Sequence, residues 1–132
     1  MDDRNLIAVA EQAAATSRVL RGPLVGATVK ADDGRVFLGC RLEYEDPSLD
    51  QDALSNAIAA GRVEGMRKVV RAGFYMPSSG DSEEPAALPP LETAALHRLK
   101  EMAVPETVII LSAGTGAFVE KPLSELLAEA GV

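Results

Sequence analysis

Cysteine and histidine each occur once in this sequence, as Cys40 and His97. One thiol cannot form a disulfide within the chain, and one thiol with one imidazole cannot supply the ligands of a zinc site. Cys40 lies in an apolar run, which indicates a small buried residue rather than a reactive thiol. His97 lies in a predicted helix, where a lone histidine is more often a boundary residue than a catalyst. Neither a disulfide nor a zinc site is therefore expected, and a reducing cytoplasm is the expected compartment.

Arg41 and Glu43 are separated by one residue at the end of a predicted strand. A guanidinium group offers a planar fork of donors that fits a carboxylate or a phosphate, so Arg41 could bind an anionic ligand. The plainer alternative is that Arg41 and Glu43 form an exposed ion pair at the strand end. We favour the exposed pair, and the residues alone leave both interpretations open.

The acidic segment 46–52 alternates oxygen-bearing side chains in the manner of a calcium-binding loop. Gln51 stands where such a loop needs its glycine, and Ala57 stands where it needs its final bidentate glutamate. Calcium binding is therefore not predicted. Ser48 or Asp50 is expected instead to cap the helix that follows.

The elements that position these residues follow from hydrophobic periodicity and from turn residues. The predicted helices cover about 5–18, 49–61, 93–102 and 122–127, and the predicted strands cover 25–30, 35–40, 66–75, 107–111 and 117–119. The turn at Asp32-Asp33-Gly34 joins the first two strands as an antiparallel hairpin. Alternation of strands and helices in the second half implies parallel strands with crossover helices. The chain is expected to be one α/β domain, residues 1–132, with a mixed five-stranded sheet between helices and a long loop over 77–90.

Composition narrows the class of protein further. The 132 residues are 47% hydrophobic and 25% charged, as in ordinary globular domains, and the net charge of −7 disfavours a nucleic-acid partner. No apolar run approaches the roughly 20 residues of a membrane helix. The acidic N-terminus lacks the features of a signal peptide, so a cytoplasmic protein is expected. The Arg- and Ala-rich composition is typical of a GC-rich bacterial genome.

The order and spacing of Val25-Gly26-Ala27, of the run Asp33-Gly34-Arg35-Val36-Phe37-Leu38-Gly39-Cys40 and of Glu43 resemble the start of the small cytidine deaminase and blasticidin S deaminase family. The remaining chain is similar to that family too, with a helix closing at Gly61, a strand, a Pro-containing loop, another helix, a strand and a Leu-Ser-Glu-Leu-Leu end. The resemblance implies a three-layer α/β/α cytidine deaminase-like fold. It also implies assembly as a homodimer or homotetramer.

The zinc-binding and proton-transfer residues of that family are missing at the matching positions. Zinc deaminases place His or Cys two residues before a catalytic Glu, and they carry Pro-Cys-x-x-Cys on a second helix. The first motif aligns with Asp52-Ala53-Leu54, so Asp52 replaces the zinc ligand and Leu54 replaces the catalytic Glu. The second motif aligns with Pro90-Leu91-Glu92-Thr93-Ala94, so Leu91 and Ala94 replace the two cysteines. One aspartate cannot replace three zinc ligands, so neither zinc nor another cofactor is expected.

The resemblance also suggests which residues surround the remaining cleft. Glu43 matches a ribose-hydroxyl acceptor, while Arg41 replaces the usual Asn partner of that residue. Asp52 would lie at the site of the lost metal as a general base, as a ligand anchor or, ranked first, as a partner of the helix dipole. Leu54 and Leu91 would make this region packed core or an apolar cleft, and Glu92 is expected to favour the N-terminus of its helix electrostatically.

Two functions are consistent with this pattern. The preferred one is a catalytically degenerate, zinc-free homo-oligomer that binds a small cyclic or nucleoside-like ligand or serves a regulatory or structural role. The alternative is a repurposed enzyme of bacterial specialised metabolism, using Asp52, Glu43, Arg41 or His97 for acid-base or binding chemistry without zinc.

Overall fold

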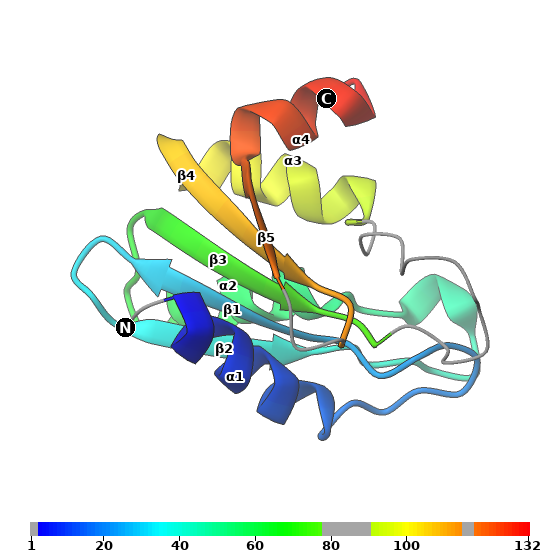
Figure 1. Ribbon diagram of the computed structural model, residues 1–132. Helices are drawn as coiled ribbons and strands as arrows, with labels where there is room; N and C mark the ends of the chain where they lie inside the picture. The colour runs from blue at the N-terminus through cyan, green and yellow to red at the C-terminus, as the bar shows by residue number, and fades with distance from the viewer. Residues whose placement is uncertain (1–2, 78–90, 115–117) are drawn as a thin grey trace.

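In the computed structural model, which describes residues 3–77, 91–114 and 118–132, four α-helices accompany five strands (Figure 1). The helices are α1 (Asp3–Ala14), α2 (Ala53–Val63), α3 (Thr93–Met102) and α4 (Leu123–Ala130). The strands are β1 (Gly26–Ala31), β2 (Val36–Cys40), β3 (Val69–Tyr75), β4 (Ala103–Ser112) and β5 (Val119–Pro122). A 3-10 turn at Pro47–Leu49 precedes α2. Most of the predicted loop over 77–90 lies outside the described residues.

The strands form one mixed sheet in the order β2-β1-β3-β4-β5. β1 runs antiparallel to both β2 and β3, β3 and β4 are parallel, and β5 is antiparallel to β4. The turn between β1 and β2 requires Gly34, whose φ of 92° lies in the left-handed region. The predicted hairpin, the parallel pair and the five-stranded sheet are thereby confirmed.

Helix α1 covers one face of this sheet, because three positions on that face leave room for its backbone. A Cβ atom at Gly26 would lie 1.8 Å from the carbonyl oxygen of Ala10, and one at Gly73 would lie 3.3 Å from the carbonyl oxygen of Leu6. Between them, the buried Thr28 hydroxyl donates to the same Leu6 carbonyl at 3.0 Å. Small and hydroxyl-bearing side chains thus bring α1 unusually close to β1 and β3.

The other three helices pack on the opposite face. Ala27 pairs with Gly39 across β1 and β2, and a Cβ atom at Gly39 would lie 2.3 Å from the backbone nitrogen of Ala57 in α2. Ala95 and Leu99 of α3, together with Leu123 of α4, join the same apolar core, which also contains residues of β1, β3 and β4. One helix, a sheet and three helices therefore make the expected α/β/α layers (Figure 1).

Several predicted boundaries shift. The helix expected over about 5–18 ends at Ala14, since the hydroxyls of Thr16 and Ser17 donate to the carbonyls of Ala13 and Val25. The helix expected from residue 49 begins at Ala53, because Pro47–Leu49 forms the separate 3-10 turn. None of the helices in the described part of the chain has the length and apolar character needed to cross a lipid bilayer.

The strand and C-terminal boundaries shift as well. The strand expected from residue 66 begins at Val69, and β4 runs from Ala103 to Ser112 rather than over 107–111. β5 and α4 begin and end later than expected, while part of the strand predicted over 117–119 lies outside the described residues. By contrast, α3 has the predicted bounds.

Candidate functional site

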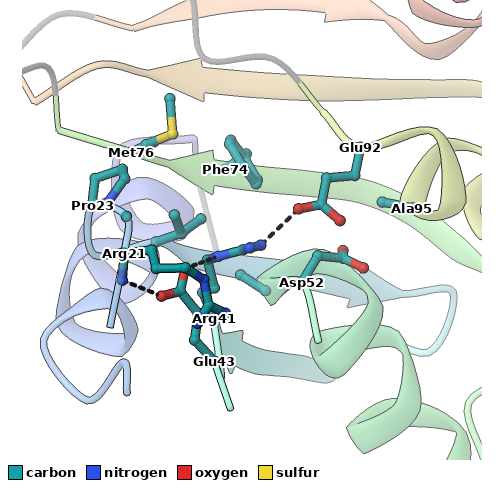
Figure 2. A pocket seen from close by; sticks show the side chains of 12 residues that line it. Arg21, Pro23, Arg41, Glu43, Asp52, Phe74, Met76, Glu92 and Ala95 are labelled. Atoms are coloured by element: carbon teal, nitrogen blue, oxygen red, sulfur yellow. Dashed lines mark hydrogen bonds and ion pairs between the residues drawn. The ribbon is translucent and has the colours of Figure 1, made fainter. Parts of the chain in front are cut away.

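A cavity of about 370 Å³ opens at the end of the sheet where β1 begins and where β2 and β3 end (Figure 2). Gly26 pairs with both Cys40 and Tyr75, so the residues adjacent to these three meet at this end of the strands. The N-termini of α2 and α3 complete the wall. The lining residues are Arg21, Gly22, Pro23, Val25, Arg41, Glu43, Asp52, Ala53, Phe74, Met76, Glu92 and Ala95.

Main-chain hydrogen bonds hold the three irregular segments of this wall together. The N–H of Arg18 donates to the carbonyl of Arg41 at 3.1 Å, and the N–H of Glu43 donates to the carbonyl of Arg18 at 2.6 Å. Leu42 and Gln51 exchange two further hydrogen bonds, of 3.0 and 2.9 Å. The backbone positions of Arg41 and Glu43 are therefore fixed from both sides.

Glu43 is buried, and its carboxylate is fully engaged by the protein. Oε1 accepts from the backbone N–H groups of Leu20 and Arg21 at 2.6 and 2.7 Å, and Oε2 accepts from Nε of Arg41 at 2.8 Å. The Arg41 hydrogen bond, followed by those from Arg21 and Leu20, lowers the pKa of Glu43 from 4.5 to about 2. The predicted Arg41–Glu43 ion pair therefore forms, but its expected exposure is wrong, because the Glu43 side chain is only 2% exposed.

Arg41 binds carboxylates of this chain with its whole fork (Figure 2). Besides Nε to Glu43, Nη1 donates to Oε1 of Glu92 at 2.6 Å, and Nη2 lies 3.5 Å from Oδ2 of Asp50. The hydrogen bonds to Glu43 and then Glu92 raise the pKa of Arg41. Arg21 also binds Asp50, at 2.5 Å. The two guanidinium groups of the cavity wall thus have their charge offset by carboxylates of the protein.

Glu92 occupies the N-cap position of α3 but makes no side-chain capping hydrogen bond. Its carboxylate reaches Arg41 instead, 51 residues away in sequence, although the Glu92 side chain is 54% exposed. Within the described residues its second oxygen, Oε2, accepts no hydrogen bond. Glu92 therefore ties the start of α3 to the end of β2.

Asp52 caps α2. Its Oδ2 atom accepts from the backbone N–H of Ser55 at 2.8 Å, while Oδ1 lies 3.7 Å from Nη1 of Arg98. The side chain is 9% exposed, and among residues 3–77, 91–114 and 118–132 its Oδ1 atom has this ion pair but no hydrogen bond. The favoured expectation, a partner of the helix dipole, agrees with this geometry.

The predicted capping of α2 by Ser48 or Asp50 is wrong. The N–H and hydroxyl of Ser48 both donate to Asp46, which caps the 3-10 turn. Asp50 accepts from the N–H of Tyr44 at 2.9 Å. In the acidic segment, Asp46 therefore caps the 3-10 turn and Asp52 caps α2. Asp50 stabilises the bend between them, where the chain returns to Leu42.

Two predicted site residues do not line the cavity. Leu54 is fully buried in the core, and Leu91 is partly buried against it. Since successive helix residues point about 100° apart, Ala53 faces the cavity where its neighbour Leu54 faces the core. Ala95 of α3 also lines the cavity. Cys40 is half-buried, and His97 is exposed on α3.

The residues at this site do not fit a catalytic zinc ion. Such an ion needs three protein ligands, and residues 3–77, 91–114 and 118–132 contain no group of three His, Cys, Asp or Glu that could hold a metal. Asp52 is followed by apolar Ala53 and Leu54, and the guanidinium group of Arg98 lies 3.7 Å from its Oδ1 atom, where a cation would be repelled. Glu43 has three N–H donors already.

The sequence patterns indicated Arg41, Glu43, Asp52 and Glu92 but not the other lining residues, among them Arg21, Phe74 and Met76. Phe74 lies in an apolar strand whose pattern is the same for core and cavity wall. Arg21 belongs to Arg21-Gly22-Pro23, which predicted only the end of a helix. A single charged residue in a turn before a strand, such as Arg21, indicates a binding site only weakly.

No protein-family profile and no curated protein sequence matches this chain. Solved structures do. Cytidine deaminase from Burkholderia pseudomallei is 22% identical with a TM-score of 0.81, and the alignment covers 96% of each chain. Cytidine deaminase from Mycobacterium tuberculosis is 26% identical with a TM-score of 0.71, covering 96% of this chain and 95% of that one. The protein from Mycobacterium leprae is 23% identical with a TM-score of 0.74, covering 96% and 98%. The chain therefore has a cytidine deaminase-like fold.

Proposed function

We propose that this protein is a small-molecule-binding member of the cytidine deaminase-like fold that does not carry out zinc chemistry. The observation that carries the proposal is the cavity itself, which opens at the end of the sheet. The carboxylates around it bind guanidinium groups and backbone N–H groups of the chain. Its volume of about 370 Å³ lies at the lower end of the range of about 300–1,000 Å³ typical of small-molecule sites.

The wall of the cavity is preorganised for binding. Phe74, Met76 and Val25 give it an apolar surface, and the ion pairs of Arg41 fix its polar rim. A site whose polar groups are already held in place loses little conformational freedom when a ligand enters. One ring-sized molecule, cyclic or nucleoside-like, is the ligand we expect.

Titration of the ¹⁵N-labelled protein with cytidine and with single-ring fragments of positive, neutral and negative charge tests this proposal. We expect at least one compound to shift the amide signals of Val25, Ala53 and Ala95, while those of the distant α2 terminus near Val63 stay unchanged. If no compound at millimolar concentration shifts the cavity signals, the proposal is wrong.

We further propose a cytoplasmic homodimer or homotetramer. Four large apolar side chains in the segments that form or flank the cavity are exposed, those of Leu20, Leu24, Tyr44 and Leu49. Exposed apolar side chains favour self-association when they pack together in one interface, and we propose that these four do so. A reducing compartment suits a chain whose one cysteine has no partner within the chain.

Light scattering during size-exclusion chromatography measures the assembly. We expect the mass of a dimer or tetramer, and we expect Leu20→Ser combined with Leu49→Ser to lower it to that of a monomer. Val63→Ser is the matched control, since Val63 is 84% exposed at the far end of α2. A monomeric wild-type protein would contradict the oligomer.

One observation favours a second candidate, a repurposed enzyme. Asp52 lines the cavity, and its Oδ1 atom accepts no hydrogen bond from the residues that the structure describes, so this atom can take a proton from a bound ligand. Mass spectrometry of each bound compound after incubation tests this candidate. A product that forms with the wild-type protein and not with Asp52→Asn would support it, whereas recovery of every compound unchanged would exclude Asp52 as a base for those compounds.

A further inference from the structure

The polar groups of the cavity are not equally available to a ligand. Both oxygens of Glu43 are taken by N–H donors, and three carboxylates surround the guanidinium group of Arg41. Arg21 donates to the carbonyl of Tyr44 at 2.9 Å and binds Asp50. An anionic ligand would therefore have to break an ion pair that already exists.

Two acceptors remain available. Within the part of the chain that the structure describes, Oδ1 of Asp52 has only the ion pair with Arg98 at 3.7 Å, and Oε2 of Glu92 accepts no hydrogen bond. Both side chains line the cavity, one from the start of α2 and the other from the start of α3 (Figure 2). The Asp52 side chain is only 9% exposed, so a charge-assisted hydrogen bond to it is less weakened by solvent than one at the surface.

The charge and shape of the wall act in the same direction. Two guanidinium groups and three carboxylates line the cavity, a net charge of −1, and Phe74 lies in the wall with Ala53 and Ala95. A positively charged ligand gains from the carboxylates, and its ring can pack against an aromatic side chain and two small methyl groups.

From these features we propose that the cavity selects a planar organic cation, such as an amidinium or guanidinium group attached to a ring, whose N–H groups donate to Asp52 and Glu92 while its ring packs against Phe74. A planar N–H fork offers several donors, so one such group can donate to two carboxylates. The inference rests on the proposed binding function and names the class of ligand for the same site.

Benzamidine, benzamide and benzoate test it, because the three probes share a ring and a size but carry positive, zero and negative charge. We expect benzamidine to bind at least about tenfold more tightly than either of the other two probes in calorimetry and in amide-shift titrations, the effect of one charge-assisted hydrogen bond. Added salt should weaken benzamidine binding and leave benzamide binding unchanged.

Variants locate the charge recognition. Asp52→Asn retains a side chain that caps a helix, and Glu92→Gln changes a half-exposed side chain, so both are expected to fold. Each should weaken benzamidine binding about tenfold without affecting benzamide binding. Glu101→Gln is the matched control on α3, where the carboxylate is exposed and does not line the cavity, and it should bind like the wild-type protein.

The outcomes separate this inference from the proposed function. If benzamide or benzoate shifts the signals of Val25, Ala53 and Ala95 as strongly as benzamidine does, the cavity binds small molecules but the preference for a cation is wrong. Benzamidine binding that neither Asp52→Asn nor Glu92→Gln weakens would also overturn the inference. If none of the three probes binds while cytidine or another ring compound shifts these signals, the inference fails and the proposed function stands. If no compound shifts them, both proposals fail.

Discussion

Nε of Arg41 lies 2.8 Å from Oε2 of Glu43, and this ion pair at the rim of the cavity joins a partly buried guanidinium group to a buried carboxylate. Arg41 extends the contact to Glu92, while Glu43 extends it to the backbone of Leu20 and Arg21. One pair of side chains thereby joins the segment before β1, the end of β2 and the start of α3. Its burial makes this pair the main electrostatic support of the site.

Glu43→Gln should lower the free energy of unfolding by about 2–3 kcal/mol, because it leaves Nε of the partly buried Arg41 without its buried carboxylate partner. Urea unfolding at pH 7 measures the change. Glu45→Gln is the control, since Glu45 is exposed two residues away, and its effect should stay within about 0.5 kcal/mol. Equal effects of the two substitutions would show that the buried pair adds nothing to stability.

Acid should remove the contribution of Glu43. Folding lowers the pKa of Glu43 from 4.5 to about 2, so its contribution is fully present above pH 4.5 and disappears as the pH falls towards 2. The difference in unfolding free energy between the wild-type protein and Glu43→Gln should therefore shrink across this range. A difference that stays constant from pH 7 to pH 3 would mean that Glu43 does not titrate as the structure implies.

Asp52→Ala should destabilise the protein by about 1 kcal/mol, the usual effect of removing an N-cap side chain. Asp52→Asn keeps an acceptor for the N–H of Ser55 and should change stability by only a few tenths of that amount. Thermal and urea unfolding of the two variants give the comparison. If alanine is tolerated as well as asparagine, Asp52 does not stabilise α2 as a cap.

Gly39→Ala should destabilise the protein by about 3 kcal/mol or more, since the added methyl group would meet the backbone of α2 at Ala57 and Ala53. Gly61→Ala is the matched control, because its methyl group meets mainly the flexible end of Met66, and alanine favours a helix interior. We expect it to change stability far less in urea unfolding. Similar losses for both substitutions would show that close packing of α2 on β2 is not required.

Much of the fold could be predicted from the sequence, because local patterns define it. The bounds of α3 and the turn at Gly34 follow from an apolar stripe and from residues suited to a turn. The end of α1 could not be predicted in this way, since it depends on the hydroxyl of Ser17 bonding to the distant carbonyl of Val25. Such a partner is defined only when β1 is in place.

The candidate site was less predictable. Arg41, Glu43, Asp52 and Glu92 were all selected from the sequence, and all line the cavity. Their partners were not, because the Arg41–Glu92 contact spans 51 residues and the donors to Glu43 include backbone N–H groups, which leave no trace in residue type. Leu54 was predicted to line the cavity, but its neighbour Ala53 does so. The two side chains point about 100° apart around the axis of α2, a difference that the sequence pattern did not resolve.

The central proposal is that this protein does not carry out zinc chemistry. Its most direct test combines metal analysis with an assay of ammonia release from cytidine. The protein is purified without chelators from zinc-supplemented cells. We predict far less than one zinc ion per chain after dialysis and no ammonia above that of the buffer. One zinc ion retained per chain, with ammonia released from cytidine, would contradict the account.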